Sequence, residues 1–168
     1  MQLTELFLAE LDREAPRSRR ALEQVPDGKY DWKPHEKSMT FGYLAELVAT
    51  MPSWITMGIK QDALDLNPPG EKRERPSYRT RAALVDALDK AVADARAALS
   101  DTTDDHLMRP WRLLVGGRVV WEAAQRHVML RDTMNHLAHH RGQLTVYLRL
   151  LGAKVPALYG PSADEQTF

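Results

Sequence analysis

The sequence contains no cysteine, no excess of charge of either sign and no long apolar run. Without cysteine, disulfides, thiolate zinc sites, iron–sulfur clusters and cysteine nucleophiles are excluded. Lys plus Arg and Asp plus Glu both number 23, so nothing provides a general attraction to phosphate, and we expect no nucleic-acid partner. No apolar run approaches the roughly 18 residues that cross a bilayer, so we expect no membrane partner. The N-terminal residues lack the basic and apolar regions of a signal peptide, which favours a cytoplasmic protein.

Apolar side chains make up 43% of the 168 residues, which is enough for one well-packed core. No long polar stretch divides the chain into two parts. We therefore expect a single domain over residues 1–168.

Helical spacing of apolar residues begins in the first segment, residues 3–25. Pro16 lies within this stripe and is expected to kink the helix or to divide it into two. A second helix begins after Ser38 or Thr40, either of which can cap it, and is expected to kink at Pro52.

Three prolines, a glycine and many charges fill residues 62–77, which predicts a long connection between helices. A third helix, rich in alanine, follows a cap at Ser77 or Thr80 and runs to about residue 100.

Two short β-branched runs flank Gly116 and Gly117, which predicts a small hairpin over residues 113–120. A fourth helix is expected over about residues 122–151, with Gly152 as its left-handed cap. Each apolar stripe must be buried against the others, so the predicted fold is an all-α four-helix bundle with a small β-hairpin before the last helix.

The last predicted helix carries His136 and His140, which are one turn apart. This spacing places two imidazoles on one face about 6 Å apart, close enough to chelate one divalent cation, although such a pair also occurs as ordinary core or surface residues. His139 points about 100° away from His140. Asp132 lies one turn before His136. It can serve as a carboxylate ligand of the metal, but we favour a role in which it pairs with an arginine or orients a histidine.

Arg141 can bind a carboxylate ligand or form an ion pair between helices, and we favour the ion pair. The four tryptophans are scattered along the chain, which fits a core or a pocket wall better than a stacking platform for nucleic acid. They are Trp32, Trp54, Trp111 and Trp121.

Two stretches together resemble the DinB family, the DinB/YfiT-like metalloenzymes. They are WKPHEKSMTFGYLAELVATMPSW at residues 32–54 and NHLAHHRGQLTVYLRLLGAKVPALYGPSADE at residues 135–165. The resemblance implies a four-helix bundle with an up-down-down-up course, a bacterial source and a homodimer. It also implies a divalent metal, zinc or nickel, bound through three histidines, and activities such as hydrolysis or thiol S-transfer on a small-molecule substrate. It implies no polymerase.

In this resemblance His136 and His140 match two of the three metal ligands, and Leu47 occupies the position of the third. Leucine has no lone pair, so any metal is expected to bind weakly or not at all unless Glu46, His35, Asp132 or solvent replaces the missing ligand. Two hypotheses follow. The chain is a metal-dependent hydrolase or thiol transferase of unknown substrate, or a metal-free bundle that binds a small ligand or acts as a regulatory protein.

Overall fold

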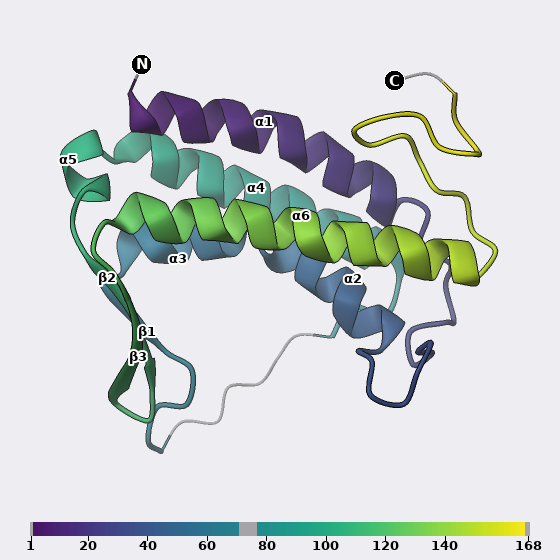
Figure 1. The fold of residues 1–168 in the computed structure, drawn as a ribbon, viewed down its shortest axis with the longest axis horizontal. Helices are drawn as coiled ribbons and strands as arrows, with labels where there is room; N and C mark the ends of the chain where they lie inside the picture. Colours follow the sequence, from purple (N-terminus) through teal and green to yellow (C-terminus); the bar gives the residue numbers. More distant parts are fainter. Residues whose placement is uncertain (1, 71–76, 167–168) are drawn as a thin grey trace.

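The computed structural model describes residues 2–70 and 77–166. Within these residues the chain forms six helices and a small three-stranded sheet (Figure 1). The helices are α1 (Leu3–Leu22), α2 (Phe41–Thr50), α3 (Ser53–Lys60), α4 (Arg81–Asp101), α5 (Asp104–Leu107) and α6 (Arg126–Leu150). The strands are β1 (Ala63–Asp65), β2 (Trp111–Val115) and β3 (Arg118–Ala123).

The long helices pack side by side and bury their apolar stripes against one another. α1 contacts α4 and α6, and α2 and α3 each contact α4 and α6 (Figure 1). The core consists of two clusters, one around Leu44, Leu88 and Leu144 and the other around Leu11 and Leu130. The sheet lies at the end of the helices where α3 stops and α6 begins.

Helix α1 runs through Pro16 as a single helix, so the expected division into two helices is not found. Its N-terminus is capped from a distant part of the chain. The Asp104 carboxylate accepts hydrogen bonds from the backbone N–H groups of Leu3, at 2.8 Å, and Thr4, at 3.0 Å. A carboxylate here satisfies free N–H groups and complements the helix dipole, which ties α5 to the start of α1.

The second predicted helix is two helices, α2 and α3, with Met51 and Pro52 between them. Pro52 has no N–H to donate to the carbonyl of Val48, so the helical hydrogen-bond pattern is interrupted there. The cap of α2 is Thr40, whose side chain accepts a hydrogen bond from the Tyr43 N–H.

The cap of α4 is Thr80, which accepts a hydrogen bond from the Ala83 N–H at 3.1 Å. Helix α6 begins at Arg126, four residues later than expected, because residues 122 and 123 pair with β2. It ends at Leu150, and Gly152 follows the C-cap residue Leu151 with a φ of +72°, the left-handed conformation that glycine tolerates.

The sheet contains the predicted hairpin and one strand that the sequence did not predict. β2 and β3 pair antiparallel around Gly116 and Gly117, whose φ angles of +58° and +79° suit a two-residue hairpin turn. β1 pairs parallel to β2 and lies in residues 62–77, which were expected to be only a connection. Asp65 accepts hydrogen bonds from the N–H groups of Gly116 and Gly117 at 2.9 and 2.6 Å. Residues 71–76 of this expected connection lie outside the described residues.

Among the described residues, no helix combines the length and apolar character that crossing a membrane requires.

Two helical glycines make opposite predictions for substitution by alanine. A Cβ on Gly42 would lie 2.9 Å from the backbone oxygen of Tyr30, whereas a Cβ on Gly142 would meet nothing within 4 Å. Gly42→Ala should therefore lower the free energy of unfolding by about 1–3 kcal/mol through overpacking. Gly142→Ala should raise it by about 0.5–1 kcal/mol, because alanine loses less entropy in a helix. Urea unfolding of both variants measures the difference, and equal effects would contradict the tight contact at Gly42.

Candidate functional site

Three histidines of α6 lie together. The ring centroids of His136 and His140 are 4.5 Å apart, and His139 lies 5.2 Å from His140 and 6.4 Å from His136. His140 is 4% exposed, whereas His136 and His139 are open to solvent. The one-turn spacing of His136 and His140 thus produces the pair of neighbouring imidazoles that the sequence predicts.

The two rings of the pair have different surroundings. His140 Nδ1 lies 2.8 Å from Gln143 Oε1, and a ring that donates from Nδ1 to this oxygen has Nε2 as the nitrogen that can bind a metal. The His136 ring packs against that of Trp54, with centroids 5.6 Å apart. Partial desolvation beside Trp54 lowers the pKa of His136, and repulsion from His140 and His139 lowers it further. The neutral imidazole, which can accept a proton or bind a metal, is therefore favoured at His136.

Leu47, at the position of the third expected histidine, lines a cavity of about 470 Å³ between α2, α3 and α4. Trp54 also lines this cavity, so the same tryptophan contacts His136 and borders the space next to Leu47. Glu46 lines the cavity too, and its carboxylate accepts a hydrogen bond from the Tyr78 N–H at 2.9 Å.

The other two suggested replacement ligands are placed differently. His35 is exposed in the loop before α2, where its Nδ1 accepts a hydrogen bond from the Lys37 N–H at 3.2 Å. Asp132 lines a second cavity together with His136. In the described parts of the chain, no three or more His, Asp or Glu side chains form a group that could hold a metal ion. Of the three ligands that the resemblance implies, the structure thus brings together the two that match, His136 and His140, and the metal site stays a prediction.

The second cavity has a volume of about 390 Å³ and lies between α3, α6 and the sheet. We call it the tryptophan cavity, because three of the four tryptophans of the chain line it. Eight of its eleven lining residues are apolar, and the other three all come from α6. The lining residues are Trp54, Met57, Leu64, Leu66, Trp111, Leu113, Trp121, Met129, Asp132, Thr133 and His136.

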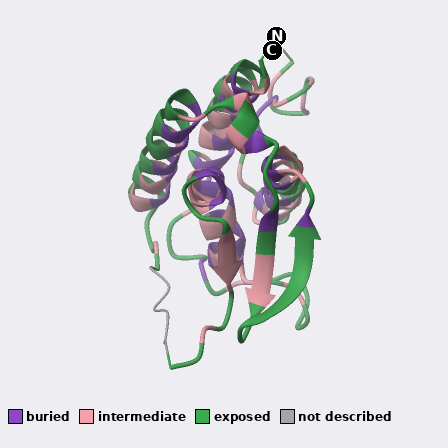
Figure 2. Cartoon of the chain, turned by 90° about the vertical axis from the view of Figure 1, so that its left-hand side faces the viewer, coloured by how far each residue is buried: buried purple, intermediate pink, exposed green. Residues whose placement is uncertain are grey.

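The tryptophan cavity extends from the core to the surface. Trp111 and Met129 are buried, whereas Leu66 and Trp121 are largely exposed. Figure 2 shows the same gradient in the sheet, whose strands are buried only where they meet the helices. Gly58 shapes the inner end, because a Cβ there would come within 2.5 Å of the Met129 sulfur. The absence of a side chain at Gly58 thus lets Met129 pack between α3 and α6.

The sequence predicted that these tryptophans lie in the core or in a pocket wall, but it did not predict that three of them line the same cavity. The two glycines of the hairpin turn predict the turn, but the register that it sets would pair Leu113 with Val120, and an irregularity between Leu113 and Leu114 shifts the pairing by one residue. Leu113 pairs with Trp121, and the rings of Trp111 and Trp121 lie 6.1 Å apart. The third wall, Trp54, comes from α3 and depends on the tertiary packing. The indole N–H of Trp111 is buried without a hydrogen-bond partner among the described residues, so apolar packing alone holds that ring.

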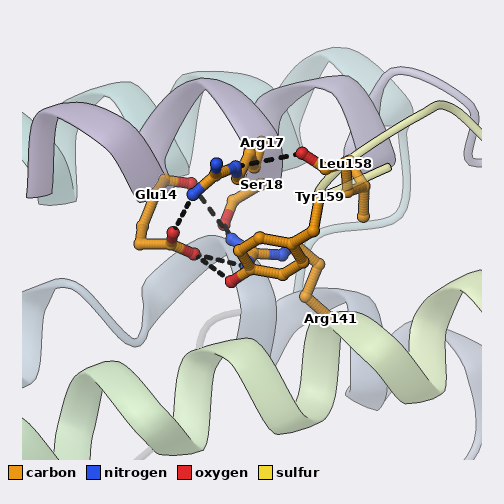
Figure 3. Close-up of polar contacts among 6 residues, drawn as sticks. All are labelled: Glu14, Arg17, Ser18, Arg141, Leu158 and Tyr159. Carbon is orange, nitrogen blue, oxygen red and sulfur yellow. Dashed lines mark hydrogen bonds and ion pairs between the residues drawn. The ribbon is translucent and has the colours of Figure 1, made fainter. Parts of the chain in front are cut away.

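Arg141, next to the histidine pair, forms the helix–helix ion pair that the sequence favoured. It is 0% exposed and binds the carboxylate of Glu14 on α1, which is 3% exposed (Figure 3). Arg141 Nη1 also donates to the Glu14 carbonyl oxygen and to Ser18 Oγ, each at 3.1 Å. The hydroxyl of Tyr159, in the C-terminal segment, accepts from Arg141 and donates to Glu14 Oε2 at 2.6 Å. The network therefore holds α1, α6 and the C-terminal segment together, and Arg141 is not open to a ligand.

Burial by itself would raise the pKa of Glu14, because it disfavours the charged carboxylate. The hydrogen bonds from Tyr159 and Arg141 and the charge of Arg141 outweigh burial, so the pKa of Glu14 is lowered. The carboxylate thus stays ionised in the core, with each partner needed to compensate its lost hydration.

Arg141→Leu should lower the free energy of unfolding by about 3–5 kcal/mol, because it removes the buried cation and leaves the Glu14 carboxylate paired with Arg17, whose side chain is 21% exposed. The double variant Glu14→Leu/Arg141→Leu should be more stable than Arg141→Leu, since neither charge remains. Arg149→Leu is the matched control on the same helix, because its pair with Asp164 lies at the surface and should matter little. Urea unfolding measures the stability of all three variants. A double variant less stable than Arg141→Leu would contradict the explanation that the buried Glu14 charge causes the loss.

The comparisons with known proteins agree with this fold. The sequence model of the DinB family matches residues 1–167. The uncharacterized protein YrdA of Bacillus subtilis (strain 168) is 25% identical over 167 residues, which cover 98% of this chain and 92% of YrdA.

Two solved structures are similar to the chain over nearly their whole length. A DinB-like protein from Bacillus cereus ATCC 10987 has a TM-score of 0.71 and 26% identity, covering 92% of this chain and 97% of that protein. The DinB-like protein YjoA of Bacillus subtilis has a TM-score of 0.69 and 20% identity, covering 96% and 99%, and shows the fold alone. Since the family match extends over almost every residue, this chain belongs to the DinB family.

Proposed function

We propose that this DinB-family protein binds a small organic ligand in the tryptophan cavity, with His136 and Asp132 as its polar contacts. The observation that carries the proposal is the cavity itself, about 390 Å³ of mostly apolar space that reaches a neutral histidine. Sites for small molecules commonly have this size, with an apolar wall and a few polar groups at one side.

The position of the polar groups supports binding in one orientation. Asp132, Thr133 and His136 all come from α6, whereas the apolar wall comes from α3, α6 and the sheet. The Thr133 hydroxyl donates to the Met129 carbonyl oxygen at 3.0 Å, so Asp132 and His136 are left as the groups that contact a ligand. An apolar body against the tryptophans would thus bring a polar end to α6.

Binding is tested with the neutral dye N-phenyl-1-naphthylamine, whose emission rises in apolar surroundings. Saturable binding by the wild type is expected, with quenching of the tryptophan emission. Trp121→Ala should weaken binding at least about fivefold, because it removes one aromatic wall. Val120→Ala, at the neighbouring residue of the same strand, is the matched control, because Val120 does not line the cavity and is largely exposed. Failure of the dye to bind, or equal weakening by both substitutions, would refute the proposal.

The second candidate is a metal-dependent hydrolase or thiol S-transferase, in which His136 and His140 bind zinc or nickel. The short distance between their rings and the neutral form of His136 favour it. Two ligands without a third give a weak site, because water must fill the remaining positions.

Zinc titration by calorimetry tests the second candidate. Leu47→His should raise zinc affinity by at least about tenfold if residue 47 of α2 can supply the third ligand. His136→Ala in the Leu47→His background is the control and should abolish that gain. Unchanged affinity in Leu47→His would mean that α2 does not supply a ligand to this pair.

We also propose that the helices form the up-down-down-up four-helix bundle of the family, within one domain. In this arrangement α2 and α3 together are the second helix of the bundle. The packing of α1, α4 and α6 against them supports it. We further propose that two copies of the chain form the homodimer that the resemblance implies.

A further inference from the structure

The tryptophan cavity has an unusual combination of aromatic rings and charge. Four rings line it, in two pairs that meet at an angle. Trp54 and His136 are inclined by 66°, and Trp111 and Trp121 by 57°. These tilted rings present aromatic surface to the cavity from α3, α6 and the sheet.

Among the described residues that line the cavity, one carries a formal charge, and it is negative. Asp132 is the carboxylate, and within this described lining there is no Lys or Arg. The Asp132 side chain is half exposed, and its contact with Arg131 is long, at 3.5 Å. A carboxylate beside apolar rings repels anions and attracts cations, and its effect increases when a ligand excludes water.

We propose that the ligand of the tryptophan cavity is a small organic cation, a methylated amine or quaternary ammonium group held between the tryptophans with Asp132 as its counter-ion. This inference rests on the proposed function, since it names the ligand class of that same cavity. The electron-rich faces of tryptophan attract cations that carry little hydration, and methylated ammonium groups are such cations. A compact primary ammonium, which is strongly hydrated, would lose more on entering an apolar cavity.

The size and the opening of the cavity are consistent with this class. About 390 Å³ exceeds what one trimethylammonium group fills, which leaves room for an attached chain. The exposed members of the described lining are Leu66, Trp121, Asp132 and His136, so the cavity opens to solvent beside them. A cation can therefore enter without unfolding of the helices.

The test compares choline with its uncharged carbon isostere, 3,3-dimethylbutan-1-ol. The two molecules have nearly the same shape and the same hydroxyl, so they differ chiefly in charge. Binding is followed by the shifts of the indole N–H signals in NMR spectra at constant chloride concentration. Choline should bind at least about fivefold more tightly than the isostere.

Asp132→Asn should reduce the preference for choline by about threefold or more, because the counter-ion is lost. Asp86→Asn, which makes the same change in net charge at an exposed site on α4, is the matched control and should leave the preference unchanged. Equal reductions in the two variants would show a general charge effect and overturn the role of Asp132.

Equal or tighter binding of the isostere would overturn the inference while leaving a small-ligand cavity in place. The same holds if the neutral dye binds the wild type and choline does not. Absence of dye binding would instead refute the proposed function itself.

Discussion

The buried ion pair between Glu14 and Arg141 is the constraint on which the arrangement of the helices depends. A charge removed from water must be compensated within the protein, and here the two charges compensate each other across α1 and α6. Tyr159 completes the compensation and brings the C-terminal segment onto both helices. Because Arg141 directly follows His140, the rotation of α6 that satisfies the ion pair also sets the direction of the histidine pair.

The polar and the apolar parts of the candidate site are therefore positioned by different forces. The direction of His136 and His140 follows from α6, which the ion pair holds. The walls of the tryptophan cavity follow from apolar packing, with Trp111 buried and its indole N–H without a hydrogen-bond partner in the part of the chain that the structure describes. His136 belongs to both, since it neighbours His140 on one side and lines the cavity on the other.

Local signals allowed much of this fold to be predicted. Thr40 and Thr80 cap helices as expected, and the hairpin forms around Gly116 and Gly117. Each of these depends on neighbours in the sequence. Nothing local marks β1, because its three residues pair with a strand nearly fifty residues later.

In the candidate site, too, contacts between residues close in the sequence could be predicted, and contacts between distant residues could not. The spacing of four residues sufficed to predict that His136 and His140 are neighbours. Arg141 was expected to form an ion pair, but its partner Glu14 is 127 residues away and no local pattern identifies it. Trp54 and Trp111 meet in one cavity through the packing of α3 against α6 and the sheet, so the composition of the cavity had to come from the structure. Pro52 shows an intermediate case, since it predicted an irregularity whose form, a break between α2 and α3, depends on the surrounding packing.

The attachment of Asp65 to the two glycines of the hairpin turn has a consequence for how this protein can change. It makes the sheet a module that is braced at its tip by its own hydrogen bonds, while the buried residues Trp111 and Ala123 pack its base against the helices. Substitutions on the outer part of that module can remodel the entrance of the cavity without disturbing α1, α6 or the charges between them. If the cavity binds a ligand as proposed, its selectivity depends on the sheet and the stability of the fold on the helices, so one can change without the other.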